Sequence, residues 1–163
     1  ADQEYWEEVI RPMVANNPNV EYIGEINERQ KSEFLGNALA LLFPIDWPEP
    51  FGIVMIEAMA CGTPVLAFRC GSVPEVIDHG VTGYIVDTID EAVAVVGDLL
   101  RLDRMAVRRR FEERFTAERM TRAYVETYRR LISLSEEPVL IQDSTLMRRA
   151  SREQISLSPR GTS

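Results

Sequence analysis

Residues 38–68 read ALALLFPIDWPEPFGIVMIEAMACGTPVLAF, and this stretch decides the fold. Its first part, residues 38–43, is apolar without alternation, which is typical of a strand covered on both faces. Three prolines between residues 44 and 50 exclude a helix there. Residues 53–59 then predict a short helix that a glycine and a proline stop, and residues 65–68 predict a second buried strand. A helix that joins two buried strands favours a parallel sheet.

Helices and strands alternate on both sides of this stretch. Residues 4–14 predict a helix with its apolar residues on one side, and residues 20–24 predict a short, β-branched strand. Asn27 and Gln30 form a capping box that predicts the start of the helix leading into the central stretch.

Capping residues also mark the helix starts after residue 68. Ser72 and Glu75 form a capping box for a helix from Val73, and residues 84–86 predict a last short strand. Three further helix starts are expected at Thr88, Asp103 and Thr116. In the first of these helices, four apolar residues are expected to face inward: Val93, Val96, Leu99 and Leu100.

The alternation predicts an α/β fold with a Rossmann-like, doubly wound parallel sheet. We expect residues 1–134 to form a partial domain, N-terminally truncated, because the chain opens with a helix where such a domain would open with a strand. The periodicity fades after Ser135, so residues 135–163 predict a flexible tail.

Length and charge exclude several classes of function. The chain has 163 residues, 45% of them hydrophobic, which is enough for one core. A net charge of −8 argues against nucleic acid or an anionic membrane as the main partner, but it permits a small phosphorylated ligand held by backbone amides. No stretch approaches the roughly 20 apolar residues of a membrane span. Cys61 and Cys70 lack metal-ligand spacing and predict reduced, half-buried thiols of a cytoplasmic protein.

The candidate site follows from the sheet topology. Ligands of open parallel sheets bind beyond the carboxyl ends of the strands, where loops lead into helices. Two such loops, residues 44–52 and residues 69–72, contain Gly52 and Gly71, which would let a ligand approach the backbone. Free N–H groups at the helix starts suit a diphosphate. Most α/β domains share this pattern, so on its own it indicates no particular ligand.

Two carboxylates make the ligand prediction for this edge of the sheet more specific. Glu49 lies in the proline-rich loop, and Glu57 lies on the second turn of the helix that follows. If both reach one cleft, they could accept bidentate hydrogen bonds from vicinal hydroxyls of a ribose or hexose. The residues alone leave an alternative open, in which Glu49 is solvated and Glu57 pairs with a surface base.

The same segment resembles a known family. Residues 49–57, EPFGIVMIE, and the following AMACGTPV resemble the E-x7-E segment of family 4 retaining glycosyltransferases. Residues 71–77, GSVPEVI, resemble the G-G-x-P-E-V-I loop of that family, with Cys70 in place of its first glycine. Residues 80–83 and 19–24 are similar to the turn and the strand on either side. The resemblance extends over about residues 4 to 130.

This resemblance implies a role for each candidate residue. Glu57 would bind the ribose hydroxyls of a nucleotide donor, and Glu49, the catalytic candidate, would lie beside the donor sugar. The remaining donor-binding positions would act through the backbone or border the base: Phe51, Gly52, Ile53, Gly71, Ile23 and Gly24.

The resemblance also implies the C-terminal, donor-binding half of a GT-B fold. The intact enzyme would transfer a sugar from a nucleoside diphosphate sugar to a sugar, lipid or polysaccharide acceptor with retention, without metal or other cofactor. The acceptor site and a basic Arg–Lys pair would lie upstream of residue 1, so we expect this chain alone to be inactive. The intact protein would be cytoplasmic or peripheral at the inner membrane face. Two alternatives stay open: a non-catalytic nucleotide or sugar-phosphate binding module, and a sugar-nucleotide epimerase of similar build.

Overall fold

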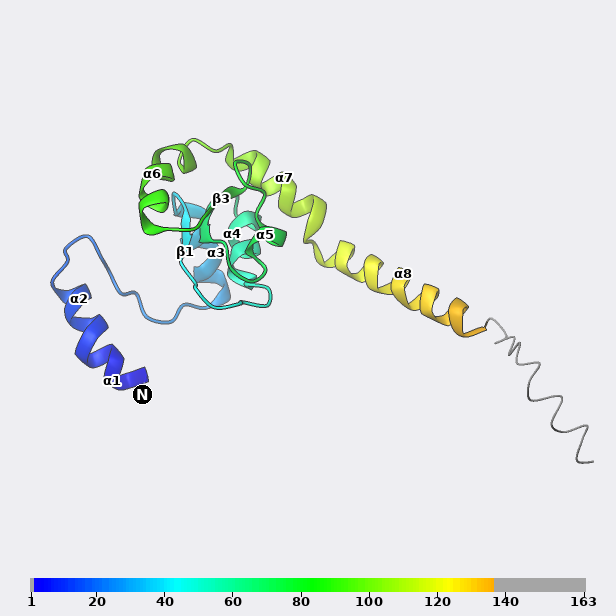
Figure 1. Cartoon of the computed structure of the whole chain (residues 1–163), viewed down its shortest axis with the longest axis horizontal. Helices are drawn as coiled ribbons and strands as arrows, with labels where there is room; N and C mark the ends of the chain where they lie inside the picture. The colour runs from blue at the N-terminus through cyan, green and yellow to red at the C-terminus, as the bar shows by residue number, and fades with distance from the viewer. Residues whose placement is uncertain (1, 137–163) are drawn as a thin grey trace, which may run out of the picture. The chain divides into compact units, whose positions relative to one another are not determined.

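The computed structural model describes residues 2–136 (Figure 1). The chain divides into two compact units, Ala1–Arg119 and Met120–Ser163. In chain order the elements are α1 (Asp2–Tyr5), the π-helix η1 (Trp6–Ile10), α2 (Arg11–Ala15), α3 (Glu28–Asn37), β1 (Leu41–Phe43), α4 (Ile53–Ala60), β2 (Val65–Phe68), α5 (Val73–Val76), β3 (Gly83–Val86), α6 (Ile89–Leu99), α7 (Arg104–Arg114) and α8 (Ala117–Glu136). No helix within residues 2–136 has both the length and the apolar character needed to cross a membrane.

The sheet is parallel, as the sequence predicts. Its three strands lie in the order β1-β2-β3, with Leu41 opposite Val65 and Val65 opposite Gly83. The central strand β2 is buried on both faces. The expectation that residues 38–43 form a strand covered on both faces is wrong, because β1 begins only at Leu41 and leaves Leu42 63% exposed at the sheet edge.

The strand predicted at residues 20–24 does not form. These residues lie in a stretch without helix or strand, and Tyr22 and Ile23 are exposed. A strand needs a neighbour for its backbone hydrogen bonds, and none of β1–β3 pairs with this stretch. Tyr22 instead packs against Trp6, with ring centroids 4.4 Å apart and ring planes tilted by 46°.

Helices cover the two faces of the sheet with separate apolar clusters (Figure 1). On one face Met55 and Met59 of α4 pack with β-strand residues and with Val107 of α7. On the other face Leu99 of α6 packs with Leu66 and Val86.

The prediction of which α6 residues face inward is largely wrong. Val93 is 70% exposed, and Ala92 and Val95 pack with Leu99 instead. These three residues follow the spacing of one helical face, and the larger Val93 lies beside that face rather than on it.

Most predicted helix caps are confirmed. The Asn27–Gln30 capping box forms, and the side chains of Thr88, Asp103 and Thr116 accept from backbone N–H groups of the helices that follow. Ser72 is the exception, because its backbone is already helical and its side chain makes no cap hydrogen bond. Its backbone N–H donates instead to the carbonyl of Glu49 at 3.0 Å.

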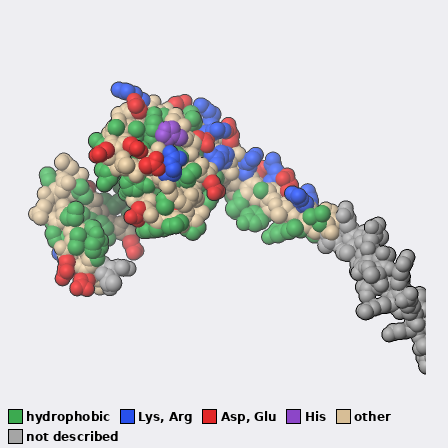
Figure 2. All heavy atoms as spheres, in the orientation of Figure 1, with side chains coloured by type: hydrophobic (Ala, Val, Ile, Leu, Met, Phe, Trp, Pro, Cys, Tyr) green, Lys and Arg blue, Asp and Glu red, His purple; other side chains and the backbone are tan. Residues whose placement is uncertain are grey.

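Helix α8 is amphipathic. Its exposed apolar residues include Met120, Tyr124 and Leu131, and Figure 2 shows hydrophobic side chains along one side of the helix and arginines along the other. Because α8 continues to Glu136, it includes the first two residues of the predicted tail. Residues 137–163 of that prediction lie outside the described residues.

Candidate donor-binding site

Glu49 is held inside its own loop, at the carboxyl end of β1. Its Oε1 accepts a hydrogen bond from the backbone N–H of Gly52 at 3.0 Å, and its Oε2 accepts one from the indole N–H of Trp47 at 3.3 Å. The N–H of Phe51 lies 3.5 Å from Oε1, which is long for a hydrogen bond. The carboxylate is therefore folded onto the start of α4, one of the two predicted anion-binding positions.

The start of α4 depends on the backbone of Gly52. This residue has a φ of +69°, a left-handed conformation that favours glycine, and α4 begins directly after it. Ile53, the first residue of the helix, is 62% exposed. A left-handed residue before the helix turns the chain so that the N–H of Gly52 meets the Glu49 carboxylate.

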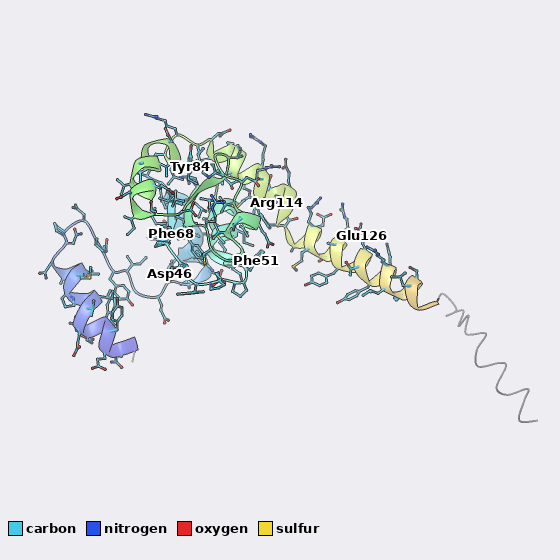
Figure 3. All side chains as sticks on the ribbon, viewed as in Figure 1. Asp46, Phe51, Phe68, Tyr84, Arg114 and Glu126 are labelled. Atoms are coloured by element: carbon cyan, nitrogen blue, oxygen red, sulfur yellow. The ribbon has the colours of Figure 1, made fainter. Side chains whose placement is uncertain are left out.

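Aromatic packing joins this loop to the end of α7. The ring of Phe51 meets the ring of Phe115 edge-on at 6.3 Å, and the guanidinium of Arg114 lies over Phe115 at 4.7 Å. Phe51 and Arg114 are labelled in Figure 3. The Phe51 side chain thus has a packing role, whereas the resemblance implies a role only for its backbone amide.

Gly71 brings the second loop against the first. A Cβ at this position would collide with the backbone carbonyl oxygen of Glu49, and it would lie 2.5 Å from the Glu49 nitrogen and 2.9 Å from the carbonyl carbon of Pro48. The space expected for a ligand is thus filled by the backbone of residues 48–49. Gly71 serves close contact between the two loops at the carboxyl edge of the sheet.

Glu57 faces α3 rather than the loop of Glu49. Its Oε1 accepts a hydrogen bond from Nζ of Lys31 at 2.6 Å, and Lys31 also reaches Glu28 at 2.9 Å. The hydrogen bond that Lys31 donates to Glu57, followed by the one that it donates to Glu28, raises the pKa of Lys31 above its usual value. These three residues line a hollow of about 120 Å³ together with Ser32, Leu35, Ala60 and Cys61.

The structure therefore assembles part of the predicted site. It brings Glu49, Gly52 and Gly71 together, and it places Glu57 on the helix that begins at this point. Ile23 and Gly24 lie apart from any strand, in the exposed stretch that leads to the Asn27 cap of α3. Their predicted role beside the base stays a prediction.

Sequence reasoning missed Lys31. The alternative in which Glu57 pairs with a base is confirmed, and Lys31 is that base. The pair is not fully at the surface, because about three-quarters of each side chain is covered. A signal was available, because Lys31 precedes the buried Leu35 by four residues and so lies on the same helical face. What the sequence could not show is that this face meets α4.

The chain matches a family model over most of its length. The model for glycosyl transferases group 1 matches residues 5–116. N-acetyl-α-D-glucosaminyl L-malate synthase of Bacillus anthracis is 35% identical over 96 residues, which cover 54% of this chain and 25% of that protein. D-inositol 3-phosphate glycosyltransferase of Saccharomonospora viridis is 42% identical over 88 residues, which cover 50% of this chain and 20% of that protein. The chain thus spans about a quarter or less of these curated relatives.

A solved structure supports the fold. The crystal structure of Anabaena HepE in complex with UDP-glucose aligns with a TM-score of 0.65 at 22% sequence identity, covering 78% of this chain and 37% of the other. The arrangement of parallel strands and helices is thus that of a GT-B glycosyltransferase domain.

Proposed function

Since the chain belongs to the group 1 glycosyl transferases, we propose that it supplies the donor-binding part of an enzyme that transfers a sugar from a nucleoside diphosphate sugar with retention. The observation that carries this proposal is the junction at the carboxyl edge of the sheet. There the loops after β1 and β2 meet through Gly71, and the Glu49 carboxylate lies at the start of α4. Open parallel sheets bind ligands at this edge. The complex of the Anabaena protein with UDP-glucose supports a nucleotide sugar as the ligand class.

Each carboxylate would contact a different part of the donor. Glu57, on the second turn of α4, would accept hydrogen bonds from ribose hydroxyls. Glu49 would lie by the donor sugar, near backbone amides of residues 51–53. These amides and the helix start would attract the diphosphate and stabilise the charge that develops on it as it leaves. None of these roles calls for a metal ion.

The rest of the enzyme would supply the acceptor site. The matched relatives are about four to five times longer than their aligned segments, which leaves ample chain for a second domain. The resemblance implies that this further part also carries a basic Arg–Lys pair for the leaving diphosphate. The acceptor would then be recognised largely by residues outside this chain.

Alanine variants of the whole protein test the division of roles. Glu57→Ala should weaken both the free nucleoside diphosphate and the sugar nucleotide about 10- to 100-fold, because a hydrogen bond to a charged group contributes about 1.5–3 kcal/mol. Glu49→Ala should spare the free nucleotide and slow transfer from the sugar-bearing donor. Titration calorimetry with both ligands and a transfer assay measure the two effects.

Glu33→Ala is the matched control, because it removes an exposed glutamate from the neighbouring helix α3. If Glu49→Ala and Glu57→Ala both behave like this control, the two carboxylates are ordinary surface residues and the proposed site is wrong. Binding of sugar nucleotides by the whole protein without any transfer would identify a binding module instead.

A further inference from the structure

The ion pair of Lys31 and Glu57 joins two helices far apart in sequence. Nζ of Lys31 lies 2.6 Å from Oε1 of Glu57, and the exposed fractions of the two side chains are only 25% and 28%. Glu28, the second partner of Lys31, is 88% exposed. Coverage shields the contact with Glu57 from solvent and salt more than the contact with Glu28. Lys31 is thus held mainly toward α4.

Contacts at both ends of α3 fix the position from which Lys31 reaches Glu57. The Asn27–Gln30 capping box sets the first turn of the helix. At the other end the buried hydroxyl of Thr63 donates to the Leu35 carbonyl at 2.6 Å, and Arg104 donates to the Gly36 carbonyl at 2.8 Å. Because α3 is capped at its start and anchored to Thr63 and Arg104 at its end, the ammonium group has a defined place beside α4.

The choice of lysine at this position is unusual for this chain. Lys31 is the only lysine in a sequence with 18 lysine and arginine residues in total. An ammonium group is a compact point charge that can satisfy one carboxylate oxygen, whereas a guanidinium fork tends to bind both oxygens at once. In the structure Lys31 donates a hydrogen bond to Oε1 of Glu57. Each carboxylate oxygen is an acceptor in its own right, so Oε2 keeps its capacity for another donor.

We propose that Lys31 is a positioning residue, whose ammonium group holds Oε1 of Glu57 and leaves Oε2 for a ribose hydroxyl of the donor. This inference rests on the proposed function, because it takes Glu57 as the ribose-binding residue. Lys31 acts through Glu57: without it the glutamate side chain would sample several rotamers and would lose side-chain entropy on binding the ribose.

Nucleotides with and without ribose hydroxyls test the inference on the whole protein. Calorimetry first selects the tightest binder among ADP, GDP and UDP, which is then compared with its 2′,3′-dideoxy counterpart. Lys31→Met should weaken the ribonucleotide about tenfold, the equivalent of about 1.4 kcal/mol, and leave the dideoxy analogue unchanged. Lys31→Arg should show the same ribose-dependent loss, because its fork would occupy both oxygens of Glu57. Arg29→Met, which removes a positive charge from the same helix, should bind both nucleotides like wild type.

The Glu57→Ala variant separates the failure of this inference from that of the proposed function. If Glu57→Ala shows the ribose-dependent loss and Lys31→Met does not, Lys31 does not position Glu57, and the proposed function stands. If Glu57→Ala loses nothing, or the wild-type whole protein binds none of the three nucleotides, both fail.

Two further outcomes would also count against the inference. Equal weakening of the dideoxy analogue by Lys31→Met would show that Lys31 does not act through the ribose site. Wild-type affinity of Lys31→Arg would overturn the single-oxygen geometry. Circular dichroism checks that the variants fold, and Lys31→Gln replaces Lys31→Met if that variant does not.

Discussion

Substitution of Gly71 by alanine tests how closely the two site loops approach each other. Gly71 has a φ of +52°, and a Cβ there would lie 2.5 Å from the Glu49 nitrogen and 2.9 Å from the Pro48 carbonyl carbon. Both neighbours are backbone atoms, which cannot rotate away as a side chain can. Alanine at this position therefore meets two separate costs, one from its own backbone conformation and one from the opposing loop.

The two costs can be estimated separately. Left-handed backbone costs a residue with a Cβ about 1–2 kcal/mol. Forcing a methyl group into packed surroundings adds about 1–3 kcal/mol. Gly71→Ala should thus lower the free energy of unfolding by about 2–5 kcal/mol. Gly80 provides the matched control, because it has a φ of +77° and a Cβ there would meet nothing within 4 Å. Gly80→Ala should cost only the backbone share, about 1–2 kcal/mol.

Urea unfolding of the two variants, followed by circular dichroism, measures the difference. We expect Gly71→Ala to be less stable than Gly80→Ala by about 1–3 kcal/mol. Equal destabilisation would show that the loop at residues 48–49 does not press on Gly71 in solution. The account of how the two loops meet would then be wrong.

Two further predictions concern the contacts around α3. Thr63→Val should lower the free energy of unfolding by about 1–3 kcal/mol, because it removes two hydrogen bonds of the buried hydroxyl, one to the Leu35 carbonyl at 2.6 Å and one from the charged Arg104 at 2.9 Å. A variant with the wild-type urea unfolding curve would contradict this. The pKa of Lys31 is raised in the folded chain, so its contribution to stability is complete below the unfolded pKa of about 10.4 and is lost as the pH rises through the folded pKa. The stability difference between wild type and Lys31→Met should therefore be constant near neutral pH and shrink only in strong alkali, whereas a difference that shrinks between about pH 6 and 8 would point to another group.

The sequence predicts the central unit of the fold well, because several local signals agree there. The strand at residues 65–68 and the helix from residue 53 are found at the expected positions. Each is fixed by its own residues: a continuous apolar run, a proline-rich entry and a glycine exit. The caps at Asn27 and Thr88 are equally local, since the capping side chain and the N–H that donates to it lie three residues apart.

Predictions that depend on distant partners succeed less often. Residues 20–24 have the composition of a strand but no neighbour among β1–β3, and composition alone cannot supply one. Ser72 has the sequence of a capping residue, but its N–H is used by Glu49, which is more than twenty residues away in the chain. The inward face of α6 consists of the residues that meet β2 and β3. Ala92 therefore packs inward, whereas the larger Val93 is exposed.

The same distinction applies to the candidate site. Glu49 and Glu57 can be found from the sequence because they lie in one motif with fixed spacing. Lys31 reaches Glu57 across 26 residues, and only the packing of α3 on α4 brings the pair together. Gly71 is expected to let a ligand approach the backbone, but the backbone of residues 48–49 occupies that space. This depends on how the loop after β1 folds, which the local sequence does not show.

The contact between Glu49 and Gly52 has a consequence for the order of events at the site. The N–H of Gly52 already donates to the Glu49 carboxylate at 3.0 Å, so a donor group that uses this amide must first displace the carboxylate. The Glu49 backbone cannot follow, because its carbonyl accepts from Ser72 and Gly71 packs against it. Only the side chain is then free to rotate, away from the start of α4 and about a fixed Cα. Binding of a sugar oxygen of the donor at Gly52 and release of the Glu49 carboxylate would thus be one coupled step, which places the freed carboxylate beside the donor sugar.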